Sequence, residues 1–144
     1  MKIINEMKID FLSKSSNESF GRVAVSAFVS QLDPTVAELS DIKTAVSEAV
    51  TNCIVHGYEH TYGIISVIVR IFESRVVEIS VIDRGKGIEN VEKAMEPMFT
   101  TGNAEERSGM GFTVMETFMD KIKVISKPAD GTKVIMIKKL CADT

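Results

Sequence analysis

The chain has 144 residues, 44% of them hydrophobic and 26% charged, which is enough for one domain with its own core. Its formal net charge of -3 argues against direct binding to nucleic acid, which needs a basic surface. The two cysteines form no disulfide framework, and no apolar run approaches the roughly 18 residues that span a bilayer. The N-terminal residues do not resemble a signal peptide. We therefore expect a single domain over 1–144, in the cytoplasm and without membrane contact.

The first part of the chain predicts a strand followed by two helices. Residues 2–13 alternate loosely between apolar and polar side chains, as in a strand. Apolar residues then recur at helical spacing over about 18–32. Asp33 and Pro34 suit the N-cap and the first position of the next helix. Gly57 is a plausible end for that second helix.

The rest of the chain is dominated by strand-like runs in pairs. The predicted elements are strands over 63–73 and 75–83, a short helix over 89–96, a loop over 97–108, a helix over 110–119 and strands over 121–127 and 132–139. Each pair of strands is separated by a short turn, which favours hairpins. The order predicts an α/β fold, a two-layer sandwich with helices on one face of a mixed, mostly antiparallel sheet.

A carboxylate and an amide lie one helical turn apart in the second predicted helix. Glu48 and Asn52 share one helix face, away from the apolar stripe that contains Val46 and Val50. A carboxylate at such a position can accept a proton, and an amide oxygen is a suitable ligand for Mg²⁺. Taken alone, this pair is better explained as part of a solvated helix face with ordinary polar residues.

Two glycine motifs follow. Asp83 ends an apolar strand, and Gly85 and Gly87 allow the backbone to turn sharply and approach a planar ring. Taken alone, the motif also fits a surface turn. Gly109 and Gly111 open the helix over 110–119, where backbone N–H groups can bind phosphate. A flexible loop that enters a helix is the alternative.

Two residues stand directly before the second glycine motif. Arg107 can pair with a terminal phosphate, and Ser108 follows it. The loop over 97–108 can act as a lid that excludes water. Taken alone, an arginine at such a position is more often a solvent-exposed charge.

In this order the motifs resemble the GHKL ATPase superfamily. Glu-x-x-x-Asn, Asp-x-Gly-x-Gly and Gly-x-Gly match its first three sequence boxes, and Gly131-Thr132 matches the last. The resemblance implies the Bergerat ATP-binding fold with Mg²⁺ and ATP or ADP. Longer stretches resemble a narrower family, the anti-sigma F factors of endospore-forming bacteria, which are small serine kinases. These stretches are 20–28, 31–35, 47–52, 56–58 and 106–112.

The resemblance also implies roles for individual residues. Glu48 would be the general base, and Asn52 would hold Mg²⁺. Asp83 would accept a hydrogen bond from the adenine amino group. The other residues that it assigns to the nucleotide site are Gly85, Gly87, Thr101, Arg107, Ser108, Gly109, Gly111 and Thr132, with Arg107 also catalytic. Partner-binding positions would be Arg22, Thr51 and Glu106.

The family resemblance further implies two protein partners and a homodimer. One partner is the sporulation sigma factor F, which would be inhibited, and the other is an anti-anti-sigma factor, which would be phosphorylated on serine. A stress-response anti-sigma kinase would share every catalytic residue. A nucleotide-gated sequestering module would lack transfer activity, although Glu48 argues against it. A sensor histidine kinase would need a dimerisation segment, and none fits before residue 16.

Overall fold

The computed structural model describes residues 1–58, 61–88, 91, 95 and 111–141. Its main elements are β1 (Ile3–Leu12), α1 (Ser16–Val29), α2 (Val36–Asn52), β2 (Ile64–Phe72), β3 (Val76–Asp83), α4 (Gly111–Phe118), β4 (Lys121–Lys127) and β5 (Gly131–Lys139). Short 3₁₀ turns follow α1 and β2, and a π-helical turn, Cys53–Gly57, continues α2. The strands, the hairpins and the three helices follow the sequence prediction. The predicted helix over 89–96 falls largely outside the described residues, and the loop over 97–108 falls entirely outside them.

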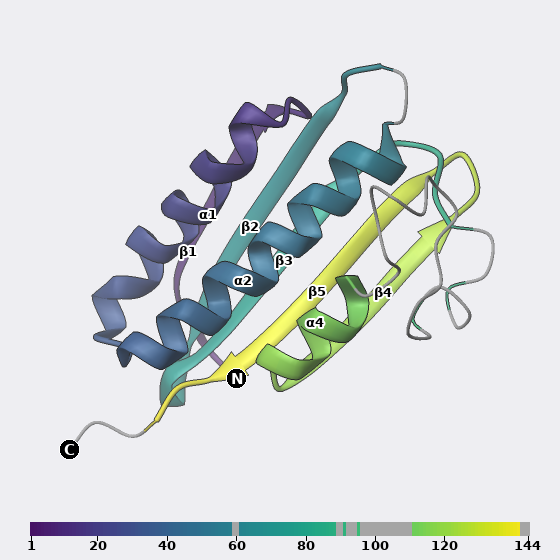
Figure 1. Cartoon of the computed structure of the whole chain (residues 1–144). Helices are drawn as coiled ribbons and strands as arrows, with labels where there is room; N and C mark the ends of the chain where they lie inside the picture. Colours follow the sequence, from purple (N-terminus) through teal and green to yellow (C-terminus); the bar gives the residue numbers. More distant parts are fainter. Residues whose placement is uncertain (59–60, 89–90, 92–94, 96–110, 142–144) are drawn as a thin grey trace.

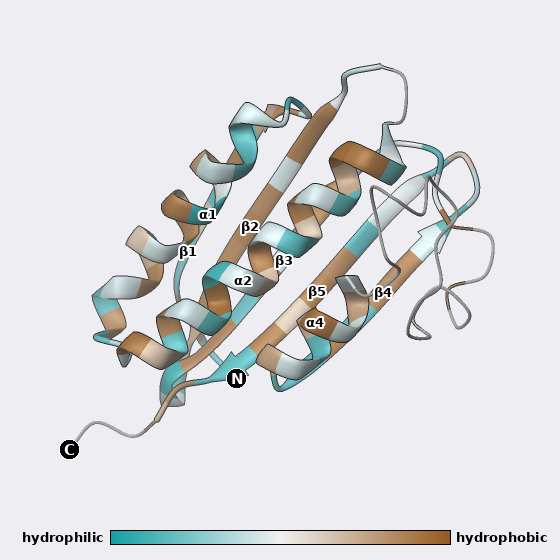
Figure 2. Cartoon of the chain, viewed as in Figure 1, coloured by the Kyte–Doolittle hydropathy of each residue, from teal (hydrophilic) through white to brown (hydrophobic). Residues whose placement is uncertain are grey.

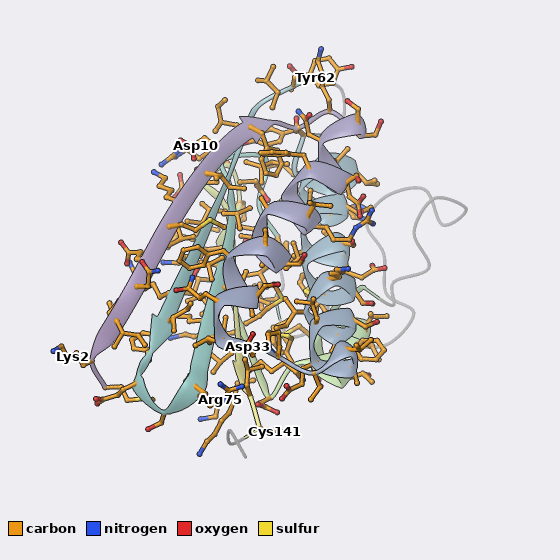
Figure 3. The ribbon with its side chains drawn as sticks, turned by 90° about the vertical axis from the view of Figure 1, so that its left-hand side faces the viewer. Lys2, Asp10, Asp33, Tyr62, Arg75 and Cys141 are labelled. Atoms are coloured by element: carbon orange, nitrogen blue, oxygen red, sulfur yellow. The ribbon has the colours of Figure 1, made fainter. Side chains whose placement is uncertain are left out.

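The strands form one five-stranded sheet in the order β1-β2-β3-β5-β4. Every neighbouring pair is antiparallel, so the predicted mostly antiparallel sheet is confirmed in a fully antiparallel form. Both predicted hairpins are present, as β2–β3 and β4–β5. All three described helices cover the same face of the sheet (Figures 1 and 3). The architecture is the predicted two-layer α/β sandwich.

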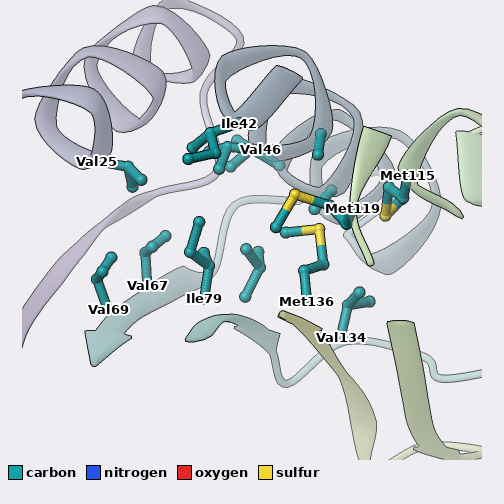
Figure 4. Packing of buried hydrophobic residues seen from close by; sticks show 14 of the residues in the cluster. Val25, Ile42, Val46, Val67, Val69, Ile79, Met115, Met119, Val134 and Met136 are labelled. Carbon is teal, nitrogen blue, oxygen red and sulfur yellow. The ribbon is translucent and has the colours of Figure 1, made fainter. Parts of the chain in front are cut away.

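The core lies between α2 and the central strands. On α2, Ile42 and Val46 are fully buried, and they face Val67 of β2 and Ile79 of β3 across the layer (Figure 4). β2 is mostly hydrophobic, and so is the middle of β5, beneath the helices (Figure 2). Burying one such side chain contributes about 1.5–3 kcal/mol, so this layer holds the helices firmly against the sheet.

The start of α2 differs from the prediction. Thr35, and not Asp33, is the N-cap: its hydroxyl accepts from the Glu38 N–H at 3.0 Å, and Glu38 Oε1 accepts from the Thr35 N–H at 2.9 Å. A reciprocal capping box needs Glu or Gln three residues after the cap. Thr35 has one at that spacing, whereas Val36 stands three residues after Asp33. Asp33 instead adopts a left-handed conformation, φ 48°, at the end of the preceding 3₁₀ turn.

Candidate functional site

Asp83 is a buried carboxyl at the end of β3. It is only 5% exposed, on the face of the sheet that the helices cover. Its Oδ1 accepts from the Gly85 N–H at 2.9 Å. Burial raises the pKa of Asp83 above its ordinary value, although hydrogen bonds from the Gly85 backbone and the Cys53 thiol oppose this shift. A desolvated carboxyl at a strand end is the kind of group that binding sites use.

The turn after Asp83 packs against the end of α2, backbone to backbone. A side chain at Gly85 would place its Cβ 1.9 Å from the Gly57 carbonyl oxygen, and one at Gly57 would meet the Asp83 carboxyl at 2.9 Å. The Lys86 N–H donates to the same Gly57 oxygen at 3.0 Å. Both glycines are therefore required by close approach, and the π-helical turn after α2 lies in direct contact with Asp83 and the turn that follows it.

The other side of this turn lies on the β4–β5 hairpin. Gly87 has φ +75°, and a Cβ there would lie 1.9 Å from the Lys127 carbonyl oxygen. The Ala129 N–H donates to the Lys86 carbonyl oxygen at 2.6 Å. The predicted glycine turn thus lies between the end of α2 and the hairpin, and only glycine suits the conformation at position 87.

Thr132 lies opposite Asp83 in the β3–β5 register. Its hydroxyl is 2.8 Å from Ser126 Oγ, which also donates to the Gly131 carbonyl oxygen at 2.9 Å and accepts from the Ile88 N–H at 2.8 Å. Ser126 was missed by the sequence reasoning. The available signal is its position in β4, where it follows Ile122 and Val124 on the core side but is polar.

Glu48 and Asn52 are both partly buried and lie one helical turn apart on α2. Because α2 continues through the π-helical turn to Gly57, one element carries this pair and also contacts Asp83. The structure therefore brings the first two sequence motifs to one end of the molecule. No group of three or more His, Cys, Asp or Glu side chains suited to a metal occurs within the described part of the chain. An amide oxygen at Asn52 still fits Mg²⁺, which commonly takes one or two protein ligands together with phosphates.

The third motif is described only in part. Gly111 is the first residue of α4 and is buried, and α4 lies beside α2 on the sheet (Figure 1). Its Phe112 and Met115 belong to the core. The remaining predicted site residues lie outside the described residues: Thr101, Glu106, Arg107, Ser108 and Gly109.

Arg22 connects the two long helices. Its guanidinium lies 3.4 Å from Glu18 Oε1 on α1 and 3.4 Å from Ser47 Oγ on α2. Thr51 stands one helical turn after Ser47 and is partly buried. The two predicted partner-binding residues that the structure describes therefore lie on neighbouring parts of the helical layer.

Comparisons with known proteins agree with this architecture. Residues 18–138 match the histidine kinase-like ATPase domain family. The RsbU and RsbW domains of a Mycobacterium tuberculosis protein give a TM-score of 0.69 at 19% identity, covering 97% of this chain and 34% of that chain. The mycobacterial sensor histidine kinase MprB gives a TM-score of 0.56 at 13% identity, covering 93% of this chain and 97% of that chain. At these identities the likeness establishes the fold alone.

Curated relatives are much more similar. The anti-sigma F factor of Thermoanaerobacter pseudethanolicus is 59% identical, over 99% of both chains. Those of Caldanaerobacter subterraneus and Clostridium acetobutylicum are 60% and 58% identical, over 96% and 94% of this chain and the same shares of theirs. The chain therefore belongs to the anti-sigma F factor family of the histidine kinase-like ATPases. Among the described residues, no helix has the length and apolar character needed to cross a membrane.

Proposed function

We propose that this chain, as one domain over 1–144, binds and inhibits the sporulation sigma factor F and phosphorylates an anti-anti-sigma factor on serine with Mg²⁺-ATP. The observation that carries the proposal is the buried Asp83 carboxyl. It stands at a strand end, beside a glycine turn that a Cβ would block, in a chain about 59% identical to anti-sigma F factors. Membership of the family supports the assignment of the two protein partners, and the geometry around Asp83 supports the assignment of ATP as the ligand.

In this proposal, Asp83 recognises the base. Its carboxyl accepts a hydrogen bond from the adenine amino group, and Gly85 and Gly87 leave room beside the ring. Thr132 lies opposite Asp83 and shares a hydrogen bond with Ser126, which supports a position for both hydroxyls at the edge of the base. A charge-assisted hydrogen bond, such as the one from the adenine amino group to the Asp83 carboxylate, contributes about 1.5–3 kcal/mol.

The phosphate end of the site is assigned to α2 and to the start of α4. Glu48 takes the proton of the attacking serine hydroxyl, and Asn52 provides an oxygen for Mg²⁺. Bound Mg²⁺ supplies positive charge that offsets the charge of the phosphates. Arg107, Gly109 and Gly111 contact the phosphates, and Arg107 also offsets negative charge during transfer. Thr101 and Ser108 belong to the same nucleotide site.

Two further features complete the proposal. Arg22, Thr51 and Glu106 form part of a surface shared by the sigma factor and the antagonist. The chain acts as a homodimer in the cytoplasm. Phosphorylation of the antagonist ends its ability to displace sigma from the ATP-loaded dimer.

The test is transfer of labelled γ-phosphate from Mg²⁺-ATP to the cognate antagonist protein, for the wild type and Glu48→Gln. Acid-stable label on serine, lost in the variant while ATP binding persists, is the expected result. Binding of ATP and of sigma without any transfer would leave a nucleotide-gated sequestering module and contradict the kinase assignment. Transfer to a stress-response antagonist in preference to the sporulation one would contradict the partner assignment.

A further inference from the structure

Tyr58 ends the π-helical turn that continues α2. Its N–H donates to the Cys53 carbonyl oxygen at 3.1 Å, a bond between residues five apart. In a continuing α-helix this oxygen would accept from Gly57 instead. Such single π turns insert one extra residue and are frequent at functional sites. The extra residue places Tyr58 outside the helix, beside the beginning of β2.

The Tyr58 hydroxyl joins the ends of two strands. It accepts from the Arg84 N–H at 2.7 Å and donates to the Ile64 carbonyl oxygen at 2.8 Å. The β2–β3 register ends with Ile65 opposite Asp83, so the next pair would be Ile64 and Arg84. The hydroxyl connects one backbone group from each of these residues. It therefore marks the point where the ladder stops and the Asp83 turn begins.

The ring of Tyr58 is held from the side of β2. A Cβ at Gly63 would lie 2.3 Å from the ring, so the ring packs directly on the Gly63 backbone. The preceding residue, Gly57, packs on the Asp83 carboxyl. A tyrosine hydroxyl keeps its proton at neutral pH, and burial raises the pKa of Tyr58 further, so this hydroxyl remains a donor to Ile64. Gly57 thus contacts Asp83 at the end of β3, and Tyr58 contacts Gly63 and Ile64 at the start of β2.

We propose that Tyr58 is a positioning residue of the nucleotide site. By bridging Ile64 and Arg84, its hydroxyl sets where the strand pair ends and hence the direction in which Asp83 presents its carboxyl to the base. The effect is on base recognition and not on the phosphates, because the bridge lies at the Asp83 end of the site. This inference rests on the proposed role of Asp83 toward adenine.

The test uses the full chain with Tyr58→Phe, which keeps the ring and removes only the hydroxyl. Tyr62→Phe is the matched control, because Tyr62 is the other tyrosine and is 65% exposed. Calorimetry gives the Kd of ATP and of inosine triphosphate, which carries an oxygen in place of the adenine amino group. The expected result for Tyr58→Phe is a roughly three- to tenfold weaker Kd for ATP and little change for inosine triphosphate. Tyr62→Phe should change neither.

The ratio of the two constants does not depend on how much of a variant is folded, so partial unfolding cannot imitate the expected result. Gly63→Ala offers a second variant, since its Cβ would displace the ring; the same loss of discrimination is expected. An equal loss for both nucleotides, or none, would overturn the positioning role. A wild type that binds both nucleotides equally would overturn the proposed role of Asp83, and the role of Tyr58 with it.

Discussion

Asp83 combines burial with a negative charge, and this combination gives the first prediction at the scale of single residues. Asp83→Asn keeps the size of the side chain but removes the charge that strengthens its hydrogen bond to an adenine amino group. We expect ATP affinity to fall roughly 10- to 100-fold by calorimetry. Asp130→Asn, at an exposed carboxyl in the β4–β5 turn, is the control. Unchanged affinity in the Asp83 variant would remove this residue from the base site.

The raised pKa of Asp83 gives a second prediction, on stability. Between the ordinary pKa of 3.8 and the raised value, the folded chain binds more protons at this carboxyl than the unfolded chain does. The free energy of unfolding therefore falls as pH rises through that window. Above the window, the stability lost through Asp83 stays constant. Asn does not titrate, so the nucleotide-free wild type should lose stability relative to Asp83→Asn as pH rises from 3.8. Urea unfolding across pH measures this; a difference that stays constant would contradict it.

The candidate site residues that the sequence predicts are those that share one short motif. Asp83, Gly85 and Gly87 lie in one short motif, and the structure places them together at one turn. Tyr58 and Ser126 act through contacts that join distant segments, Tyr58 with Arg84 and Ser126 with Ile88. Such contacts depend on strand register and on an extra residue in a helix, and neither is visible in the spacing of apolar residues.

At the scale of elements, the capping box of α2 gives the third prediction. Thr35→Ala removes the hydroxyl that accepts from the Glu38 N–H and should cost about 1 kcal/mol of stability. For a chain of this size, that lowers the thermal midpoint by roughly 2–4 °C. Ser15→Ala is the matched control, because Ser15 is the N-cap of α1 and makes no capping hydrogen bond with its side chain. Equal shifts in the two variants would contradict the assigned cap.

The same box explains why the start of α2 was predicted two residues too early. Asp33 and Pro34 are good signals for a helix start when each is considered alone. The reciprocal bonds between Thr35 and Glu38 require a spacing that only the later start provides. Glu38 also accepts from the Cys141 N–H at 2.7 Å, so the cap connects the helix to the end of β5. Residue preferences indicate the region in which α2 begins, and the two hydrogen bonds between Thr35 and Glu38 determine that Thr35 is its N-cap.

At the scale of the whole molecule, the alternation of apolar residues was sufficient to predict two layers and two hairpins. It did not predict that β5 would lie between β3 and β4. Because of that order, Thr132 lies opposite Asp83, at the end of the sheet where Gly57, in the π-helical turn after α2, contacts Asp83. Strand order is decided by packing between distant segments, and a local pattern carries no information about it.

The helical layer gives the last prediction, which concerns the partner. Arg22 bridges α1 and α2, yet its side chain is 36% exposed and its ion pair with Glu18 is a surface one, worth at most about 1 kcal/mol. Arg22→Ala should therefore leave the fold and the ATP affinity intact while weakening binding of the cognate sigma factor roughly five- to thirtyfold.

Arg70 is the matched control for this experiment, because its side chain is 38% exposed and also pairs with a carboxylate, that of Glu6 at 2.6 Å. Arg70 alternates with the buried Val69 and Ile71 on β2, so it lies on the face of the sheet away from the described helices. Arg70→Ala should leave both affinities unchanged. A partner that binds the helical layer contacts Arg22 and not Arg70. If both variants weaken sigma binding equally, then the loss of positive charge, and not the surface around Arg22, determines the interaction. A fall in ATP affinity with Arg22→Ala would instead make Arg22 a support of the fold.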